Sequence, residues 1–331
     1  MALLGSYVLA PLVRASTESL FFPYSWEDLH QSGYDLDKDD EEAVKRHHKA
    51  AEQGNAQAQT HLAWLYYEGI GAEKDYKKAY EWIEKAAKQG YALAQMRLGV
   101  LYAEGHGVGK NTATATAWYK SAFEQAMQDA PKGDVDAQYA LGVMYANGYG
   151  VEQDDKEAVK WTQQAADQGH APAQFKLGFM YEHGLGVMQD DKTAVEWYQK
   201  AAEQGHAHAQ SNLGWSYANG QGVAKDEKEA VAWYQKAADQ GHAQAQCNLG
   251  NMYESGRGVA KDYKEAAKWY QKAAEQGHTE AQYNLGWMYD NGQGVEQDYK
   301  QAATWYQKAA DQGLANAQLS LGEMYKNGQG V

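Results

Sequence analysis

Residues 171–206 read APAQFKLGFMYEHGLGVMQDDKTAVEWYQKAAEQGH, and this stretch returns with few changes along most of the chain. Its most regular mark is the pair Ala-Gln, whose glutamines are Gln59, Gln95, Gln138, Gln174, Gln210, Gln246, Gln282 and Gln318. The spacing is 36 residues everywhere except for one step of 43, where the extra residues fall at 128–134 around Pro131 and Gly133. A fixed period of this length indicates a repeat architecture in which each unit packs on its neighbours.

Each unit predicts two helices joined by a glycine-rich turn. The first helix ends at Gly184, because glycine accepts the left-handed conformation at a helix C-terminus. Val187 in the turn is expected to plug the core, Asp190 is placed to cap the second helix, and Gly205 closes it. The apolar stripes are Ala173, Leu177, Met180 and Tyr181 in the first helix and Ala194, Trp197 and Ala201 in the second.

Two further columns predict how the paired helices meet. Gly178 and its counterparts each cost about 1 kcal/mol of helix propensity relative to alanine. We therefore expect the second helix to press against a position that has no Cβ. We interpret the tryptophans as the large core residue of each pair: Trp82, Trp118, Trp161, Trp197, Trp233, Trp269 and Trp305.

The pattern A-x-A-Q-x-x-L-G-x-M-Y-x-x-G-x-G-V-x-x-D…A-x-x-W-Y-x-K-A-A-x-Q-G-H resembles the Sel1-like repeat, a relative of the tetratricopeptide repeat. The resemblance covers residues 56–331 and implies an all-α fold, a right-handed α/α superhelical solenoid. We expect seven full units, at 56–91, 92–134, 135–170, 171–206, 207–242, 243–278 and 279–314, and then a half unit at 315–331. That half unit lacks its second helix, so we expect its face to be continued by further chain or to meet a partner.

The N-terminal part departs from the repeat. Residues 39–55 are interpreted as a half repeat made of one second helix, in which Arg46 replaces the tryptophan. Residues 1–38 are expected to form a non-repeat cap, with a short helix that starts near 25–28. Residues 2–13 are a mostly apolar run of about the length of a signal-peptide core, but no Lys or Arg precedes it. A cytoplasmic location is slightly favoured over export.

Composition excludes some classes of function. The formal net charge is −14, which provides no electrostatic footprint for nucleic acid and favours basic partners. The single cysteine, Cys247, excludes an intrachain disulfide. No run reaches the roughly 18 to 20 apolar residues that a membrane span needs.

The periodic histidines suggest a metal site at first sight. His170, His206, His242 and His278 recur with the repeat, and His208 lies near His206. We take adjacent repeats to lie about 10 Å apart, too far for ligands that must each come within about 2.1 Å of one zinc ion. We therefore interpret these histidines as turn residues that bond or stack locally, and we expect no metal and no cofactor.

Sites for nucleotides or catalysis also lack their sequence context. The Gly-x-Gly-Val loops follow no strand, and 107–110 is followed by Asn111 where a phosphate loop needs Ser or Thr. We interpret them as turns between helices. Cys247 stands at a position that is Ser211 or Tyr283 in neighbouring units, and no nucleophile elbow is present. The sequence predicts no catalytic residue.

The variable positions of the first helix point to a binding face. If it docks as in tetratricopeptide repeats, the positions two before, two after and five after its leucine line a concave groove. As a set they predict an exposed apolar patch, with an acidic end that includes Glu280 and Glu323. For any single residue, packing against the preceding repeat is the alternative. The predicted partner-binding residues are Trp64, Tyr67, Met96, Val100, Tyr139, Val143, Phe175, Phe179, Trp215, Glu254, Tyr283, Trp287 and Asp290.

The main hypothesis is a non-catalytic scaffold or adaptor that holds a partner protein against its concave face. The resemblance implies narrower alternatives. Some bacterial relatives are immunity proteins that neutralise secreted toxins such as lipases, and some cysteine-rich relatives are linked to β-lactam binding or hydrolysis. This chain departs from the latter, because it lacks paired cysteines in each repeat and a Ser-x-x-Lys helix start.

Overall fold

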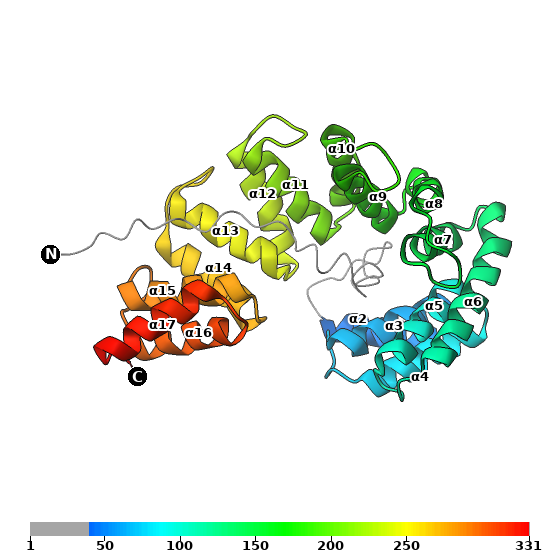
Figure 1. Cartoon of the computed structure of the whole chain (residues 1–331), viewed down its shortest axis with the longest axis horizontal. Coiled ribbons are helices and arrows are strands. Elements are labelled where there is room, and N and C mark those ends of the chain that lie inside the picture. Colours follow the sequence, from blue (N-terminus) through cyan, green and yellow to red (C-terminus); the bar gives the residue numbers. More distant parts are fainter. Residues whose placement is uncertain (1–39, 331) are drawn as a thin grey trace. The chain divides into compact units, whose positions relative to one another are not determined.

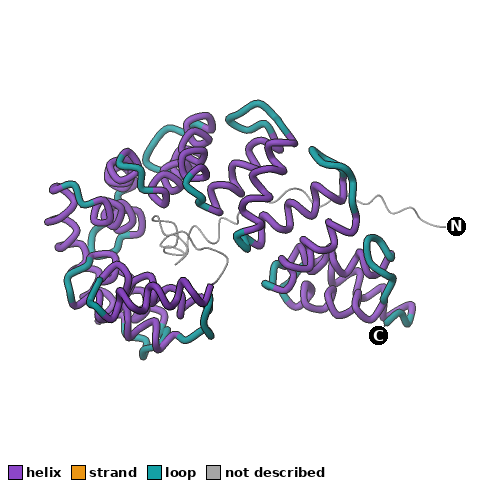
Figure 2. Tube along the Cα trace, turned by 180° about the vertical axis from the view of Figure 1, so that it is seen from behind, coloured by secondary structure: helices purple, strands orange, loops and turns teal. Residues whose placement is uncertain are grey.

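A computed structural model describes residues 40–330, and these form α-helices with one short 3₁₀ turn and no strand (Figures 1 and 2). The helices are α2 Asp40–Glu52, α3 Ala56–Glu68, α4 Tyr76–Lys88, α5 Ala92–Glu104, α6 Thr112–Asp129, α7 Val135–Asn147, α8 Asp155–Asp167, α9 Ala171–His183, α10 Asp191–Glu203, α11 Ala207–Asn219, α12 Glu227–Asp239, α13 Ala243–Ser255, α14 Tyr263–Glu275, α15 Thr279–Asn291, α16 Tyr299–Asp311 and α17 Ala315–Asn327. The expected all-α architecture is confirmed.

The described helices fall into two compact units. Residues 40–206 carry α2 to α10, and residues 207–330 carry α11 to α17. Within each unit, consecutive helices pack side by side in chain order, as α3 does with α4 and α15 with α16 (Figure 1). Each unit is therefore a stack of helix pairs, as in a solenoid.

Caps at both helix ends explain why each pair starts and stops where it does. Asp190 accepts hydrogen bonds from the backbone N–H groups of Lys192 and Thr193, at 3.0 and 3.2 Å, and so begins α10. Gly184 ends α9 with a φ of 67°, in the left-handed region that side chains disfavour. Both predictions from the sequence are confirmed.

In five of the described first helices, the glycine after the leucine lies under a tyrosine of the second helix. A Cβ on Gly178 would come within 2.8 Å of the Tyr198 ring, and one on Gly250 within 2.6 Å of the Tyr270 ring. These two tyrosines are fully buried. The expected close approach of the two helices is confirmed, and the residue that makes it is the tyrosine that follows the tryptophan.

The tryptophans lie at the edge of the core. Trp161, Trp197, Trp233 and Trp269 are between 7 and 9 % exposed, and Trp82, Trp118 and Trp305 are half-buried. The ammonium group of Lys200 lies 3.6 Å from the ring centroid of Trp197, in a cation–π contact that recurs in later repeats. The prediction that tryptophan is the large core residue is therefore wrong for the three half-buried rings, and in α10, α12, α14 and α16 the large, fully buried side chain is the tyrosine that follows the tryptophan.

The repeated glutamines connect neighbouring helices. Gln174 Nε2 donates to the carbonyl oxygen of Ala166 at 3.1 Å, and Gln204 Nε2 donates to Gln174 Oε1 at 2.7 Å. The same two bonds recur around Gln246 and Gln282. Because a buried amide is costly when it has no partner, these bonds account for the Ala-Gln and Gln-Gly pairs in the repeats that contain both.

The seven extra residues lengthen a helix more than they lengthen a turn. Helix α6 continues to Asp129, a 3₁₀ turn covers Ala130–Lys132, and Gly133 with a φ of 94° precedes α7. The residues around Pro131 and Gly133, which suggest a longer turn in the sequence, are thus mostly helical. The half repeat expected at 39–55 contains α2. The predictions for residues 1–38 concern residues outside those that the structure describes.

The apolar cores of the two units differ. In residues 40–206, one buried cluster extends from Ala51 to Trp197. In residues 207–330, the buried residues fall into separate clusters that include Leu249, Leu285 and Leu321. None of the helices in 40–330 combines the length and the apolar character needed to cross a bilayer.

Candidate protein-binding surface

Most predicted groove residues in the first unit are buried. Trp64, Met96, Val100, Tyr139, Val143, Phe175 and Phe179 are at most 5 % exposed. The expectation that they form an exposed apolar patch is therefore wrong. They belong to the unit's own packing, and this was the alternative interpretation.

Ring contacts give the physical reason. The Tyr139 ring lies 4.6 Å from the ring of His170, and Phe175 lies 4.6 Å from His206, measured between centroids. Each histidine precedes the first helix of the next repeat. The position two residues before the leucine thus faces the junction between repeats and is covered there.

Tyr67 is the predicted residue of this unit that stays half-buried. Its hydroxyl lies 2.8 Å from His106 Nδ1, and its ring packs edge-on against Tyr76 at 4.9 Å. Burial, followed by the charge of Glu104, raises the pKa of its hydroxyl. Tyr67 therefore contributes to an aromatic cluster at the turn between two helices.

Glu254 is also buried, at 5 % exposure. The Tyr270 hydroxyl lies 2.6 Å from Glu254 Oε2, and Tyr198 makes the same contact with Glu182 at 2.8 Å in the first unit. Desolvation raises the pKa of the Glu254 carboxyl. The expectation that Glu254 presents charge to a partner is wrong, because its carboxyl is buried and accepts a hydrogen bond from the Tyr270 hydroxyl.

The remaining predicted residues are partly exposed, and they all belong to the second unit. They are Trp215 on α11 and Tyr283, Trp287 and Asp290 on α15. The Tyr283 ring packs against Tyr306 at 5.5 Å between centroids, which fixes one side of it. Tryptophans that keep one face open are the residues that most often anchor a protein partner.

A column of asparagines accompanies them, and the sequence reasoning missed it. Asn212, Asn248 and Asn284 each precede the leucine of a first helix, 36 residues apart, and are at most 3 % exposed. The matching positions in the first unit are His61, Arg97, Ala140 and Lys176. The pattern A-Q-x-N-L-G in three consecutive repeats was the available signal.

Two of these amides are incompletely paired among the described residues. Asn212 Oδ1 and Asn284 Nδ2 are buried without a hydrogen-bond partner. Asn251, two residues after its leucine, receives the Tyr270 hydroxyl at 2.6 Å on its oxygen, while its Nδ2 has no partner. A buried amide without a partner costs about 1 to 3 kcal/mol. The open atoms are themselves shielded from solvent and lie inside the helix packing of the second unit.

Histidines of adjacent repeats come closer than the sequence argument allowed. His242 Nε2 lies 2.9 Å from His208 Nδ1, so the spacing of about 10 Å between repeats does not keep their side chains apart. His242 Nδ1 also accepts the backbone N–H of Ala245 at 3.1 Å, and His278 does the same for Ala281 at 3.2 Å. The expected local bonding of these turn residues is confirmed.

The Gly-x-Gly-Val loops are turns between helices, as expected. Gly186 has a φ of 69°, and a Cβ there would come within 2.1 Å of the carbonyl oxygen of Asp155. The loop therefore packs directly on the start of the preceding second helix, with no space for a phosphate on that side.

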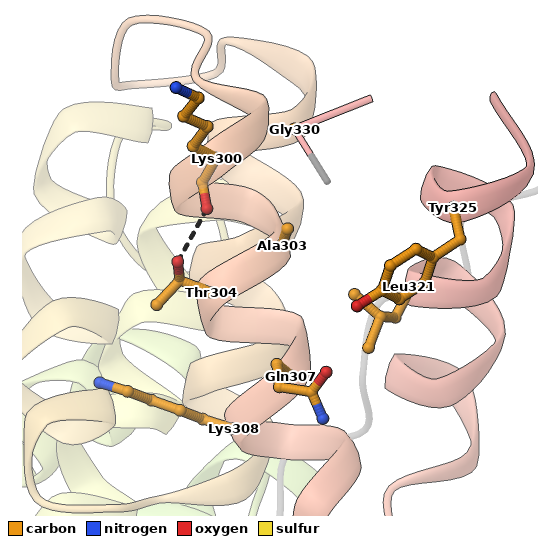
Figure 3. Close-up of a pocket in the computed structure, with 8 residues that line it drawn as sticks. All are labelled: Lys300, Ala303, Thr304, Gln307, Lys308, Leu321, Tyr325 and Gly330. Carbon is orange, nitrogen blue, oxygen red and sulfur yellow. Dashed lines mark hydrogen bonds between the residues drawn. The ribbon is translucent and has the colours of Figure 1, made fainter. Parts of the chain in front are cut away.

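The end of the second unit exposes a different kind of surface. A hollow of about 570 Å³ lies between α16 and α17, where Ala303 faces Leu321 and Tyr325 across it (Figure 3). Tyr325 and Leu319 are 61 and 65 % exposed. A Cβ on Gly322 would meet no atom within 4 Å, in contrast to Gly250. No helix among residues 40–330 covers this face of α17.

Comparison with known proteins identifies the repeat. The family described as Sel1 repeat matches residues 28–55, 56–91, 92–127, 135–170, 171–206, 207–242, 243–278, 279–314 and 315–331. The match starts at residue 28, before the half repeat that we placed at 39–55. A comparison with curated proteins found no match.

Solved structures include similar chains. A Sel1 repeat protein from Oxalobacter formigenes is 33 % identical, covers 90 % of this chain and 85 % of its own, and gives a TM-score of 0.60. The protein c5321, a protective antigen of uropathogenic Escherichia coli strains with an SLR fold, is 37 % identical over 86 % of this chain and 67 % of its own, with a TM-score of 0.47. Immunity protein Pa5087 from Pseudomonas aeruginosa is 21 % identical over 76 % of this chain and 88 % of its own, with a TM-score of 0.46.

Proposed function

The chain belongs to the Sel1 repeat family, and on that premise we propose that it is a non-catalytic scaffold that binds an extended segment of a partner protein. The proposed binding surface consists of the first helices α11, α13 and α15, in residues 207–291. We call it the asparagine face and define it by Asn212, Asn248, Asn251 and Asn284 with Trp215, Tyr283 and Trp287.

The observation that carries the proposal is the partial exposure of Trp215 and Trp287 on first helices of the second unit, at a position that is buried throughout the first unit. Neighbouring repeats stack at about 10 Å, and an extended chain rises about 3.3 Å per residue. A peptide that displaces the side chains over these shielded amides would meet one of them about every third residue. This spacing suits recognition of the main chain, with little demand on its sequence.

Side chains beside the amides provide the apolar and charged contributions. Trp215 and Trp287 keep partly exposed rings, which suit large apolar residues of a partner. Asp290 is half-buried near the exposed Glu323, and burial and then Glu323 raise the pKa of its carboxyl. Together with a net charge of −14, these acids favour a partner segment that carries Lys or Arg.

The experiment is a selection of peptides from a random library on the full-length protein, followed by affinity measurements on variants. Trp287→Ala is expected to weaken binding by tenfold or more, as estimated from a hot-spot loss of about 2 kcal/mol. Trp305→Ala is the matched control, because this half-buried tryptophan of the same repeat lies on the second helix under Lys308. Equal losses in both variants would contradict the proposal.

The asparagines allow a second, independent check. Asn284→Ala introduces a residue that the chain already has at the matching position, Ala140, so the fold is expected to tolerate it. Selected peptides are expected to lose roughly five- to tenfold in affinity, because one backbone hydrogen bond is lost. Unchanged affinity in Asn284→Ala and in Asn212→Ala would exclude the amides from the binding surface.

Roles as an immunity protein or as a β-lactam-binding protein stay predictions. Protection of cells against a co-expressed toxin tests the first, and hydrolysis of a chromogenic β-lactam by the purified chain tests the second. The scaffold proposal expects no β-lactam turnover above the buffer rate.

A further inference from the structure

A cysteine, a histidine and a glutamate meet at the junction between repeats 243–278 and 279–314. The donor atoms of Cys247 on α13, His278 before α15 and Glu280 in the first turn of α15 all lie within 4.8 Å of one another. Cys247 is fully buried, while His278 and Glu280 are half-buried above it. The thiol is thus the shielded member of the cluster, and the imidazole and the carboxylate are partly exposed to solvent.

The frame of the repeat explains why these three groups converge. At earlier junctions the histidine before a first helix packs on the side chain two residues before the previous leucine, as His170 does on Tyr139 and His206 on Phe175. At this junction the matching residue is Cys247. The histidine therefore faces a thiol instead of a ring.

The surroundings contain polar groups that the fold leaves without partners. Glu280 Oε2 is shielded from solvent and has no hydrogen-bond partner among residues 40–330. Asn284, one turn further along α15, is 3 % exposed, and its Nδ2 has no partner among them either. Both ring nitrogens of His278 are engaged without metal: Nδ1 accepts the backbone N–H of Ala281 at 3.2 Å, and Nε2 lies 3.1 Å from Gln244 Oε1, so zinc binding must replace one of these two bonds.

We infer that Cys247, His278 and Glu280 bind one Zn²⁺ ion that connects the two repeats. Thiolate sulfur, imidazole nitrogen and carboxylate oxygen are the ligands of protein zinc sites, at about 2.0 to 2.3 Å. A tetrahedral ion needs its ligand atoms roughly 3.5 Å apart, so side-chain rotations that move these atoms by about 1 Å close the site. The fourth position is taken by water or by Gln244 Oε1, once that amide is released from His278.

Other junctions offer no equivalent set among the described residues. The three matching residues one repeat earlier are Ser211, His242 and Gln244. They provide a hydroxyl and an amide in place of the thiol and the carboxylate, and these are weak zinc ligands. The chain therefore contains conservative replacements for each proposed ligand: Ser at 247, Gln at 280, and Asn at 278, as in the Asn55 cap of α3.

The test uses the full chain without an affinity tag, reduced and treated with a chelator. Equilibrium dialysis against ZnCl₂ is expected to give one ion per chain, and Co²⁺ is expected to show a thiolate-to-metal charge-transfer band. Cys247→Ser is expected to abolish that band, and His278→Asn and Glu280→Gln are expected to weaken zinc binding by roughly tenfold or more. His242→Asn, one repeat earlier, is the control and is expected to bind zinc like the unmodified chain.

Circular dichroism of each variant without metal checks that the fold is retained. Absence of bound zinc in the unmodified, folded chain would overturn the inference. So would a zinc ion that Cys247→Ser binds with unchanged affinity, because that ion would be held elsewhere. Peptide selection on the asparagine face does not enter this experiment, so the two proposals succeed or fail separately.

Discussion

The two compact units are built from the same repeat and differ in which of its side chains are exposed. In residues 40–206, the position two after the leucine holds Trp64, Val100, Val143 and Phe179, all buried. In residues 207–330 it holds Trp215, Asn251, Trp287 and Glu323, of which only Asn251 is buried. Caps, glycine contacts and glutamine bonds are the same in both. Stability of the repeat and character of its surface are therefore set by different residues.

The difference extends to the cores. One cluster unites the first unit, whereas the second is divided into smaller ones. Replacing Leu141 by Ala, a fully buried residue of the large cluster, is expected to cost about 2 to 5 kcal/mol of unfolding free energy. Leu285→Ala removes the matching leucine of the second unit and is expected to cost a similar amount. The two variants should differ in how many helices become less stable.

Native-state hydrogen exchange measures that spread. Leu141→Ala is expected to speed exchange across α3 to α9, because these helices share one core. Leu285→Ala is expected to act mainly on α13 to α17. Faster exchange over all helices in both variants would mean that the clusters of the second unit are not independent.

Acid should destabilise the first unit at the junction between repeats where the His170 side chain is buried. Burial lowers the pKa of His170 to about 4, although Asp136 acts in the opposite direction. An unfolded histidine titrates near 6.5, so between about pH 6.5 and 4 the unfolded chain binds a proton that the folded chain excludes. Stability is thus complete above pH 6.5 and falls by up to about 3 kcal/mol toward pH 4.

Urea unfolding of His170→Asn at pH 7 and pH 4 tests this. Asparagine caps α3 from the same position at Asn55, so the variant is expected to keep its stability at pH 7 and to lose less on acidification. An identical loss in the variant and the unmodified chain would exclude His170 as the acid-sensitive group.

The glycine contact should behave alike in both units and differ at the end face. Gly178→Ala and Gly250→Ala each place a Cβ within 2.8 Å of a buried tyrosine ring, and each is expected to cost about 1 to 3 kcal/mol. Gly322→Ala meets no such atom and is expected to gain up to about 1 kcal/mol of helix propensity. Thermal unfolding ranks the three, and destabilisation by Gly322→Ala would show that the end face is covered in solution.

The smallest expected effect concerns charge. Asp290→Asn is expected to reduce affinity for Lys-rich selected peptides by about two- to threefold at low salt. The effect should shrink as salt is raised, because the charges are partly exposed. Glu229→Gln on α12, an exposed acid of a second helix, is the control. Equal changes in both variants would show that Asp290 acts only through the net charge of the protein.

The repeat itself could be predicted from the sequence because its signals are local. Helix ends at Gly184 and Asp190, and the contact at Gly178, follow from backbone propensities that recur every 36 residues. The surface could not be predicted in the same way. Whether Phe175 is exposed depends on His206 in the following turn, and the analogy with tetratricopeptide repeats does not include that stacking.

The asparagine column could have been found in the sequence by searching for periodic polar residues among the apolar positions of the first helices. Asn212, Asn248 and Asn284 form a periodic polar column inside an apolar helix face, which is unusual for a core position. The orphaned atoms of Asn212 and Asn284 became visible only in the structure. The approach of Cys247 to His278 likewise depends on side chains that extend across the junction between repeats.

The most direct test of the asparagine face is hydrogen–deuterium exchange of the full chain with and without a saturating selected peptide. The account predicts that the peptide slows exchange in α11, α13 and α15, with little change in α3, α5, α7 and α9. Protection confined to the first helices of residues 40–206, or to α16 and α17 at the end face, would contradict it.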